Sequence, residues 1–215
     1  FKAETVAEKA CGSTTEKSLK GEPSAEYGMS LDKETGIWSY TLDSVGSKKY
    51  YKYQITNNGI TYWTSDIYAK ACSPDAIASQ IVDINAGTEY GTKEKYKNPF
   101  GSNGTENKDN SDAIIYEMHI RDWSRATVSD STGKFNDFAS DEVIAHLKDL
   151  GVTHVQILPM FEYAQVVNDD GYNWGYNPYH YNVPESRYTD YSSDKDGTAT
   201  VEQARAMIKK LHDNN

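Results

Sequence analysis

Short runs of apolar and aromatic residues predict β-strands in the first part of the chain. Runs rich in apolar and aromatic residues extend from Ile37 to Leu42, from Tyr50 to Thr56 and from Ile60 to Trp63. The tripeptide Asn57-Asn58-Gly59 separates the last two runs, and Asn and Gly tolerate the positive φ that a tight type I′ turn requires. The sequence therefore predicts a β-hairpin at this point.

A small antiparallel β-sandwich is expected over residues 31–85, since a further apolar run at residues 80–84 follows the hairpin. Residues 1–30 are polar and weakly patterned, which predicts an irregular or incomplete edge. Residues 86–112 are rich in Gly, Asn, Lys and Asp and have little to bury, so they are predicted to form a linker.

From residue 113 the pattern changes to strand, helix, strand, helix. Ala113 to Ile120 is the first predicted strand, and Val152 to Leu158 is a nearly continuous apolar strand, as expected when both faces are covered. Between them, Ser140 is placed to cap a helix that Gly151 would end in a left-handed conformation. This alternation predicts parallel βαβ units, and hence a multidomain fold of β followed by α/β type.

A long loop from Pro159 to Ala199 and a closing helix are expected at the end of the chain. Thr200 and Gln203 have the spacing of a capping box. The residues that predict an amphipathic helix recur at helical intervals: Val201, Ala204, Ile208 and Leu211.

Charge and hydropathy exclude several classes of partner. The net charge of −10 disfavours nucleic acid and anionic membranes, because both are bound through Lys and Arg. Apolar runs stay well short of the roughly 18 residues of a membrane span. The chain begins at Phe1, so a signal peptide could have been removed, and we favour a secreted or cell-surface location over a cytoplasmic one.

The cysteines do not predict a metal or redox site. Cys11 and Cys72 lack CxxC spacing, and two unpaired thiols are expected in preference to one long-loop disulfide. The 17 Tyr and 4 Trp residues suit the faces of sugars, although both residue types are also common in strands. Nucleotide-binding glycine motifs are absent from the sequence.

The heptapeptide Tyr172-Asn173-Trp174-Gly175-Tyr176-Asn177-Pro178 follows the second predicted strand of this region. It resembles the signature heptapeptide of type I pullulanases, which are α-1,6-cleaving enzymes of the α-amylase superfamily, glycoside hydrolase family 13, with Asn177 where the family carries Asp. Residues 115–124 and 151–159 resemble their first two barrel strands. The resemblance implies that residues 113–215 are the N-terminal part of a catalytic (β/α)8 TIM barrel, with its first two βα units.

Upstream, residues 36–38 and 66–70 resemble the immunoglobulin-like sandwich, related to starch-binding modules, that precedes the barrel in these enzymes, with Ile67 where the family has Pro. The resemblance implies hydrolysis of α-1,6-glucosidic linkages in pullulan, starch or glycogen by a retaining mechanism. Tyr176 would stack on a sugar ring, and Trp174 and Asn177 would also contact substrate. The nucleophile, the acid and the third carboxylate come from later strands, so the resemblance implies no catalytic residue in this chain, which alone would be inactive.

Simpler roles are expected for the other polar residues of this region. We expect Glu117 and His119 to be core or rim groups, and Asp122 to make a structural hydrogen bond near the strand end. Asp169-Asp170 is expected to be a solvated turn rather than a cation site, although calcium remains possible. Packing roles are expected for the three other polar residues of the loop: Tyr172, Asn173 and His180.

The expected partners are an α-glucan and the remainder of the barrel, since a barrel needs roughly 250 residues. Two parallel strands with open edges cannot bury their apolar faces alone. An alternative function is a non-catalytic α-glucan-binding protein that retains the sandwich and a remnant of the barrel. A further possibility is a fragment with no independent function.

Overall fold

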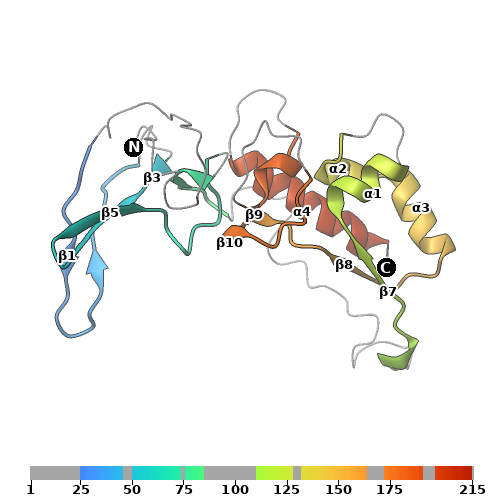
Figure 1. The fold of residues 1–215 in the computed structure, drawn as a ribbon, viewed down its shortest axis with the longest axis horizontal. Helices are drawn as coiled ribbons and strands as arrows, with labels where there is room; N and C mark the ends of the chain where they lie inside the picture. Colours follow the sequence, from blue (N-terminus) through green and yellow to red (C-terminus); the bar gives the residue numbers. More distant parts are fainter. Residues whose placement is uncertain are drawn as a thin grey trace.

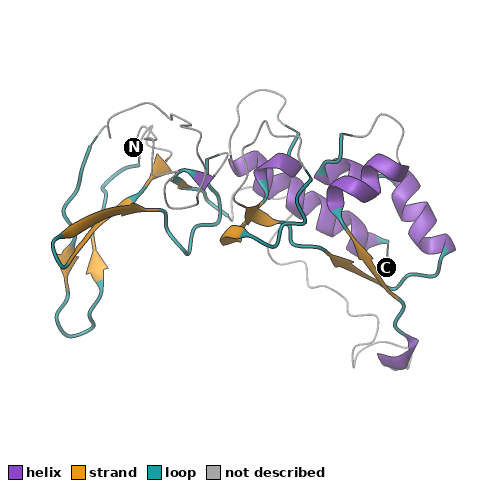
Figure 2. Cartoon of the chain, in the orientation of Figure 1, coloured by secondary structure: helices purple, strands orange, loops and turns teal. Residues whose placement is uncertain are grey.

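The computed structural model describes residues 25–45, 50–73, 76–84, 110–127, 132–163, 172–190 and 197–214. Strands β1 to β6 gather at one end of the molecule and the helices at the other, and β9 and β10 lie between them (Figure 1). Figure 2 shows that helices α1–α4 lie in one half, whereas strands occur in both halves. The candidate residues of the sequence analysis therefore lie mostly in the second half.

The first half consists of short antiparallel pairs. The strands are β1 (Ser30–Leu31) with β2 (Trp38–Ser39), β3 (Tyr50–Tyr51) with β6 (Ser79–Gln80), and β4 (Tyr53–Asn57) with β5 (Ile60–Thr64). The predicted hairpin is confirmed: Asn57 pairs with Ile60, and the turn residues Asn58 and Gly59 have φ of 50° and 76°. Both central residues have positive φ, as a type I′ turn requires.

The other predicted β-runs are shorter than expected. The run from Ile37 to Leu42 contributes only the two residues of β2, and the run at residues 80–84 contributes only Gln80 to β6. Within the described ranges every sheet has two strands, so the immunoglobulin-like sandwich stays a prediction. Cys72 is buried, whereas Cys11 lies outside the described residues, as do residues 1–24 and most of 86–112.

The second half contains the predicted parallel pair. Strand β7 (Ile115–Met118) pairs in parallel with β8 (His154–Ile157). Between them lie α1 (Ile120–Thr127), α2 (Phe135–Phe138) and α3 (Asp141–Asp149), and a short helix, η3 (Asn110–Asp112), precedes β7. The βαβ prediction is confirmed, but the strand expected over residues 113–120 is too long, because Ile120 already begins α1.

The predicted ends of α3 are also confirmed. The Ser140 hydroxyl accepts the N–H of Val143 at 3.3 Å, which satisfies one of the donors that a helix N-terminus leaves without a partner. Gly151 has φ of 70°, the left-handed conformation that ends a helix without steric cost only at glycine. Both assignments rest on local geometry, which the sequence encodes directly.

The main core lies between the α1–α3 helices and the last helix, α4 (Gly197–Asp213). Phe135 and Phe138 are fully buried there, with Met118 at the end of β7 and Met207 from α4. Burial of an aromatic side chain of this size stabilises the fold by about 2–3 kcal/mol. Because α4 helps to bury these side chains, it is a structural part of this half.

The predicted capping box of α4 is wrong, because the helix begins at Gly197 and Thr200 lies inside it. The Thr200 hydroxyl instead accepts a hydrogen bond from Thr189, and the Gln203 side chain bonds the backbone N–H and C=O of Asp190. The start of α4 is bound by β6: the Gly197 N–H donates to Gln80 Oε1 at 2.8 Å.

The long loop expected from Pro159 to Ala199 is also wrong. It contains β9 (Phe161–Tyr163), β10 (Pro178–Pro184) and a short helix, η4 (Ser186–Tyr188). Strands β9 and β10 pair antiparallel, with Pro178 opposite Tyr163 and Pro184 opposite Phe161. A three-residue strand and a strand with proline at both ends give little period-two signal, which is why the sequence pattern does not predict them. In the part of the chain that is described, no helix is both long and apolar enough to cross a membrane.

Candidate functional site

Three aromatic rings form an exposed row on the segment that leads into β10. Tyr172, Trp174 and Tyr176 are 54%, 58% and 65% exposed, whereas Asn173 is half-buried and Gly175 is buried. Outward and inward residues thus alternate over these five positions. We call Tyr172, Trp174 and Tyr176 the aromatic row.

The rings of the aromatic row do not stack on one another. The ring centroids of Tyr172 and Trp174 are 6.3 Å apart with planes at 87°, and those of Trp174 and Tyr176 are 6.5 Å apart at 54°. Edge and tilted contacts of this kind fix the rings relative to each other while their faces stay accessible. The row therefore presents flat apolar surface beside polar edges, which suits the C–H face and the hydroxyl groups of a pyranose.

Gly175 holds the middle of the row against the segment after β8. Its φ is 82°, and a Cβ at this position would overlap the carbonyl oxygen of Pro159 and lie 3.2 Å from the Pro159 Cβ. The Gly175 N–H donates to Asn173 Oδ1 at 2.8 Å, an Asx-type turn that fixes the bend. Only glycine fits both the positive φ and the close approach.

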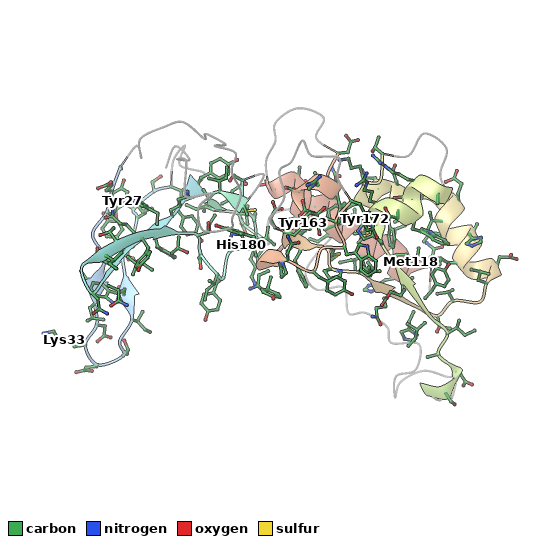
Figure 3. The ribbon with its side chains drawn as sticks, viewed as in Figure 1. Tyr27, Lys33, Met118, Tyr163, Tyr172 and His180 are labelled. Atoms are coloured by element: carbon green, nitrogen blue, oxygen red, sulfur yellow. The ribbon has the colours of Figure 1, made fainter. Side chains whose placement is uncertain are left out.

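His119 contacts the backbone of the same segment on its inward side. It follows β7 directly and is 8% exposed, and its Nε2 lies 3.0 Å from the carbonyl oxygen of Asn173. The same nitrogen is 3.1 Å from the hydroxyl oxygen of Tyr188, and the His119 and Tyr172 ring centroids are 5.6 Å apart. Figure 3 shows Tyr172 and Tyr163 among the side chains near the labelled end of β7, Met118.

Two buried glutamates join the ends of β9 and β10. Glu162 is 1% exposed and accepts hydrogen bonds from the Ser186 N–H and hydroxyl at 2.7 and 3.0 Å. Glu185 is fully buried and accepts the N–H groups of Tyr163 and Arg187 at 2.9 and 2.8 Å. Each carboxylate thus accepts a hydrogen bond from the segment of the other strand. These bonds stabilise the two buried charges.

Buried tyrosines complete the support beneath the row. Burial, followed by the charge of Glu185, raises the pKa of Tyr163 to about 12. Burial also raises the pKa of Tyr188 well above its usual range. The guanidinium carbon of Arg187 lies 5.6 Å from the centre of the Tyr163 ring, a cation–π distance.

The structure brings the predicted contact residues together. Trp174 and Tyr176 are neighbours in the aromatic row, and Asn177 is exposed beside them. Their contact with substrate stays a prediction. His180 is 6% exposed on β10, and burial lowers the pKa of its imidazole, in keeping with the packing role expected for it.

The remaining polar candidates have structural partners. Glu117 is exposed and accepts a hydrogen bond from Gln156 on β8 at 2.8 Å. Asp122 lies in α1 rather than near the end of a strand; its N–H donates to His119 Nδ1 at 3.3 Å. Burial, and then a hydrogen bond to the Asp122 carboxylate, raise the pKa of Tyr172. Tyr172 is nevertheless an exposed member of the row rather than a purely packed residue.

The sequence analysis missed Glu162, Glu185 and Tyr188. A signal for Glu162 exists in the tripeptide Phe161-Glu162-Tyr163, where a carboxylate sits between two aromatic residues. Among the described residues no three His, Cys, Asp or Glu side chains gather as a metal site needs, and Asp169-Asp170 lies outside them. Calcium binding stays a prediction.

Comparison with known proteins relates the chain to pullulanases. No known protein-family model matches it. It is 31% identical to Pullulanase A of Streptococcus pneumoniae over 90% of this chain and 18% of that protein, and 30% identical to the pullulanase of Bacillus subtilis over 83% of this chain and 25% of that protein. It is also similar to the crystal structure of an Anoxybacillus pullulanase complexed with maltotriose, with a TM-score of 0.69 and 30% identity over 87% of this chain and 27% of the other.

The chain thus spans about a fifth to a quarter of the length of these curated relatives, while they match most of its own length. Sequence and fold agree with each other, since the same family is found by both comparisons. Most of this chain is therefore similar, in sequence and in fold, to a part of the pullulanases.

Proposed function

We propose that this chain is the N-terminal part of a glycoside hydrolase that cleaves α-1,6-glucosidic linkages in pullulan, starch or glycogen with retention of configuration. The aromatic row is the observation that carries this proposal, since it offers three fixed and exposed ring faces to a glucan. Relatives named pullulanase support the reaction class, and one similar structure is described as complexed with maltotriose.

Within this chain the proposed role is substrate orientation. Tyr176 is the most exposed ring of the row and stacks on a sugar face, and Trp174 extends the same surface. Asn177 supplies an amide that can both donate to and accept from sugar hydroxyls. A surface that is already rigid orients a sugar at little entropic cost, which is how positioning groups accelerate a reaction at a distant atom.

The catalytic carboxylates are proposed to lie outside this chain. A retaining glycosidase needs two carboxyl groups about 5 Å apart that face the scissile bond. Glu162 and Glu185 are an unsuitable pair, because both are buried and their oxygens already accept backbone N–H groups. Their hydrogen bonds serve the β9–β10 pair instead.

We further propose the domain arrangement that this function needs. Residues 113–215 form the N-terminal part of a (β/α)8 barrel, residues 31–85 a carbohydrate-binding-module-like sandwich, residues 86–112 a linker, and residues 1–30 an irregular edge. Among the described residues β7 and β8 pair only with each other, and Ile115 on β7 is 62% exposed, which supports the barrel. The remainder of the barrel is the partner that would cover them.

Calorimetric titration of the chain with maltotetraose tests the proposal. We expect binding that Tyr176→Ala weakens about ten-fold, the loss of roughly 1.4 kcal/mol of stacking. Tyr68→Ala is the matched control, because Tyr68 is 75% exposed on the first half of the chain. Equal affinities for the wild type and Tyr176→Ala would refute the role of the row.

The non-catalytic alternative is separated by a second measurement. Co-expression with the remainder of a relative's barrel is expected to give a complex that releases reducing ends from pullulan. Glucan binding by the chain, combined with failure of such a complex to hydrolyse pullulan, would favour the glucan-binding protein.

A further inference from the structure

The imidazole of His119 has hydrogen-bond partners that determine where its proton lies. Nδ1 faces the backbone N–H of Asp122 at 3.3 Å, and an amide N–H can only donate. Nδ1 must therefore be the bare acceptor nitrogen. In neutral imidazole the proton is then on Nε2.

The second nitrogen faces a backbone carbonyl, which agrees with this tautomer. Nε2 lies 3.0 Å from the carbonyl oxygen of Asn173, which can only accept, and 3.1 Å from the Tyr188 hydroxyl oxygen. With the proton on Nδ1 instead, the Nδ1–H would face the Asp122 N–H, and the bare Nε2 would face the carbonyl oxygen of Asn173. The carboxylate of Asp122 is 3.7 Å from Nδ1, too far to reverse this preference.

We infer that His119 is a positioning residue for the aromatic row, because its Nε2–H donates to the Asn173 carbonyl. Asn173 is the inward residue between Tyr172 and Trp174, so a bond to its backbone fixes the direction of the rings on both sides. Gly175, packed on Pro159, is the next inward residue. The inference deepens the proposed function. Its statement about glucan binding rests on that function, whereas its statement about the positioning of the row does not.

The position of His119 explains why a histidine suits this role. Its ring is 8% exposed between β7 and α1 and contacts Tyr188 edge to face, at 5.9 Å and 88°. The donor is thus held by a strand end and by the α1 backbone rather than by another part of the same loop. A donor on a rigid element orients a loop more accurately than one within it.

The test uses the chain labelled with 5-fluorotryptophan, whose four tryptophans give four ¹⁹F resonances. Trp174→Phe assigns the resonance of the row. His119→Asn keeps an acceptor at the place of Nδ1 but does not reach Asn173, and His119→Gln places an amide N–H close to the position of Nε2. His146→Asn is the matched control, because His146 is exposed on α3.

We expect His119→Asn to shift and broaden the Trp174 resonance and to weaken maltotetraose binding about five-fold, the loss of one hydrogen bond of roughly 1 kcal/mol. His119→Gln and His146→Asn are expected to keep the Trp174 resonance at its wild-type position and to bind maltotetraose with wild-type affinity. A wild-type Trp174 resonance in His119→Asn would overturn the inference. Equal losses in the Asn and Gln variants would also overturn it, since the donor would then not matter.

Failure of the two proposals can be told apart. If the wild-type chain binds no maltotetraose, the glucan-binding part of the proposed function fails, while the ¹⁹F spectra still decide whether His119 positions the row. If His119→Asn does not fold, all four resonances change together. In that case the His119→Gln spectrum decides, because a displaced Trp174 resonance in that folded variant contradicts the donor role.

Discussion

Gly175→Ala is expected to destabilise the chain far more than an alanine at another glycine of positive φ. The substitution introduces two costs. The left-handed backbone costs a residue with a Cβ about 1–2 kcal/mol. The new Cβ also overlaps the Pro159 carbonyl oxygen, and relief of such an overlap by backbone shifts costs about 1–3 kcal/mol. The total is roughly 2–5 kcal/mol.

Gly59→Ala isolates the first cost. Gly59 has φ of 76°, close to the 82° of Gly175, but no atom lies within 4 Å of its hypothetical Cβ. We expect Gly59→Ala to lower the free energy of unfolding by about 1–2 kcal/mol. Urea denaturation followed by circular dichroism, with the same m-value for all chains, measures both variants. If both lose the same free energy of unfolding within about 0.5 kcal/mol, Pro159 does not hold the row and the steric reasoning is wrong.

Two further predictions concern the support beneath the row and the junction of the two halves. The pKa of Tyr163 rises from 10.0 to about 12 on folding, so its neutral form contributes stability that is present below pH 10 and lost as the pH rises towards 12. We expect Tyr163 to account for a loss of about 2 kcal/mol across that window. Tyr188, whose pKa is also raised, adds to the loss, so Tyr188→Phe is expected to lose less than the wild type; a flat urea midpoint between these pH values would contradict this. Gln80→Leu leaves the Gly197 N–H without its acceptor, so we expect faster amide hydrogen exchange in the first turn of α4 and a loss of about 1–2 kcal/mol. Exchange at wild-type rates would show that β6 does not hold this helix.

The sequence predicts those elements whose determinants are local. The hairpin depends on Asn58 and Gly59, residue types that tolerate the positive φ of a type I′ turn. The start of α3 depends on a serine hydroxyl three residues from the N–H that it accepts. The parallel pairing of β7 and β8 follows from the strand and helix order, because strands joined by helices return in the same direction.

The elements that the sequence does not predict depend on distant residues. The cap of α4 comes from Gln80, which lies 117 positions before Gly197, and nothing near Thr200 reveals it. Strands β9 and β10 are stabilised by Glu162 and Glu185, and a buried carboxylate gives a polar signal in a strand pattern. The heptapeptide identifies the rings of the candidate site, whereas the supports at His119 and Pro159 come from segments brought there only by folding.

The alternation of the aromatic row limits how this segment can change. Every second residue from Tyr172 to Tyr176 carries an exposed ring, and the residues between them, Asn173 and Gly175, make the anchoring contacts. Deletion or insertion of one residue within the row would exchange ring-bearing and anchoring positions. A change of two residues would keep the rings exposed but would move Gly175 away from Pro159, so any change of length disturbs either the exposure of the rings or their anchoring.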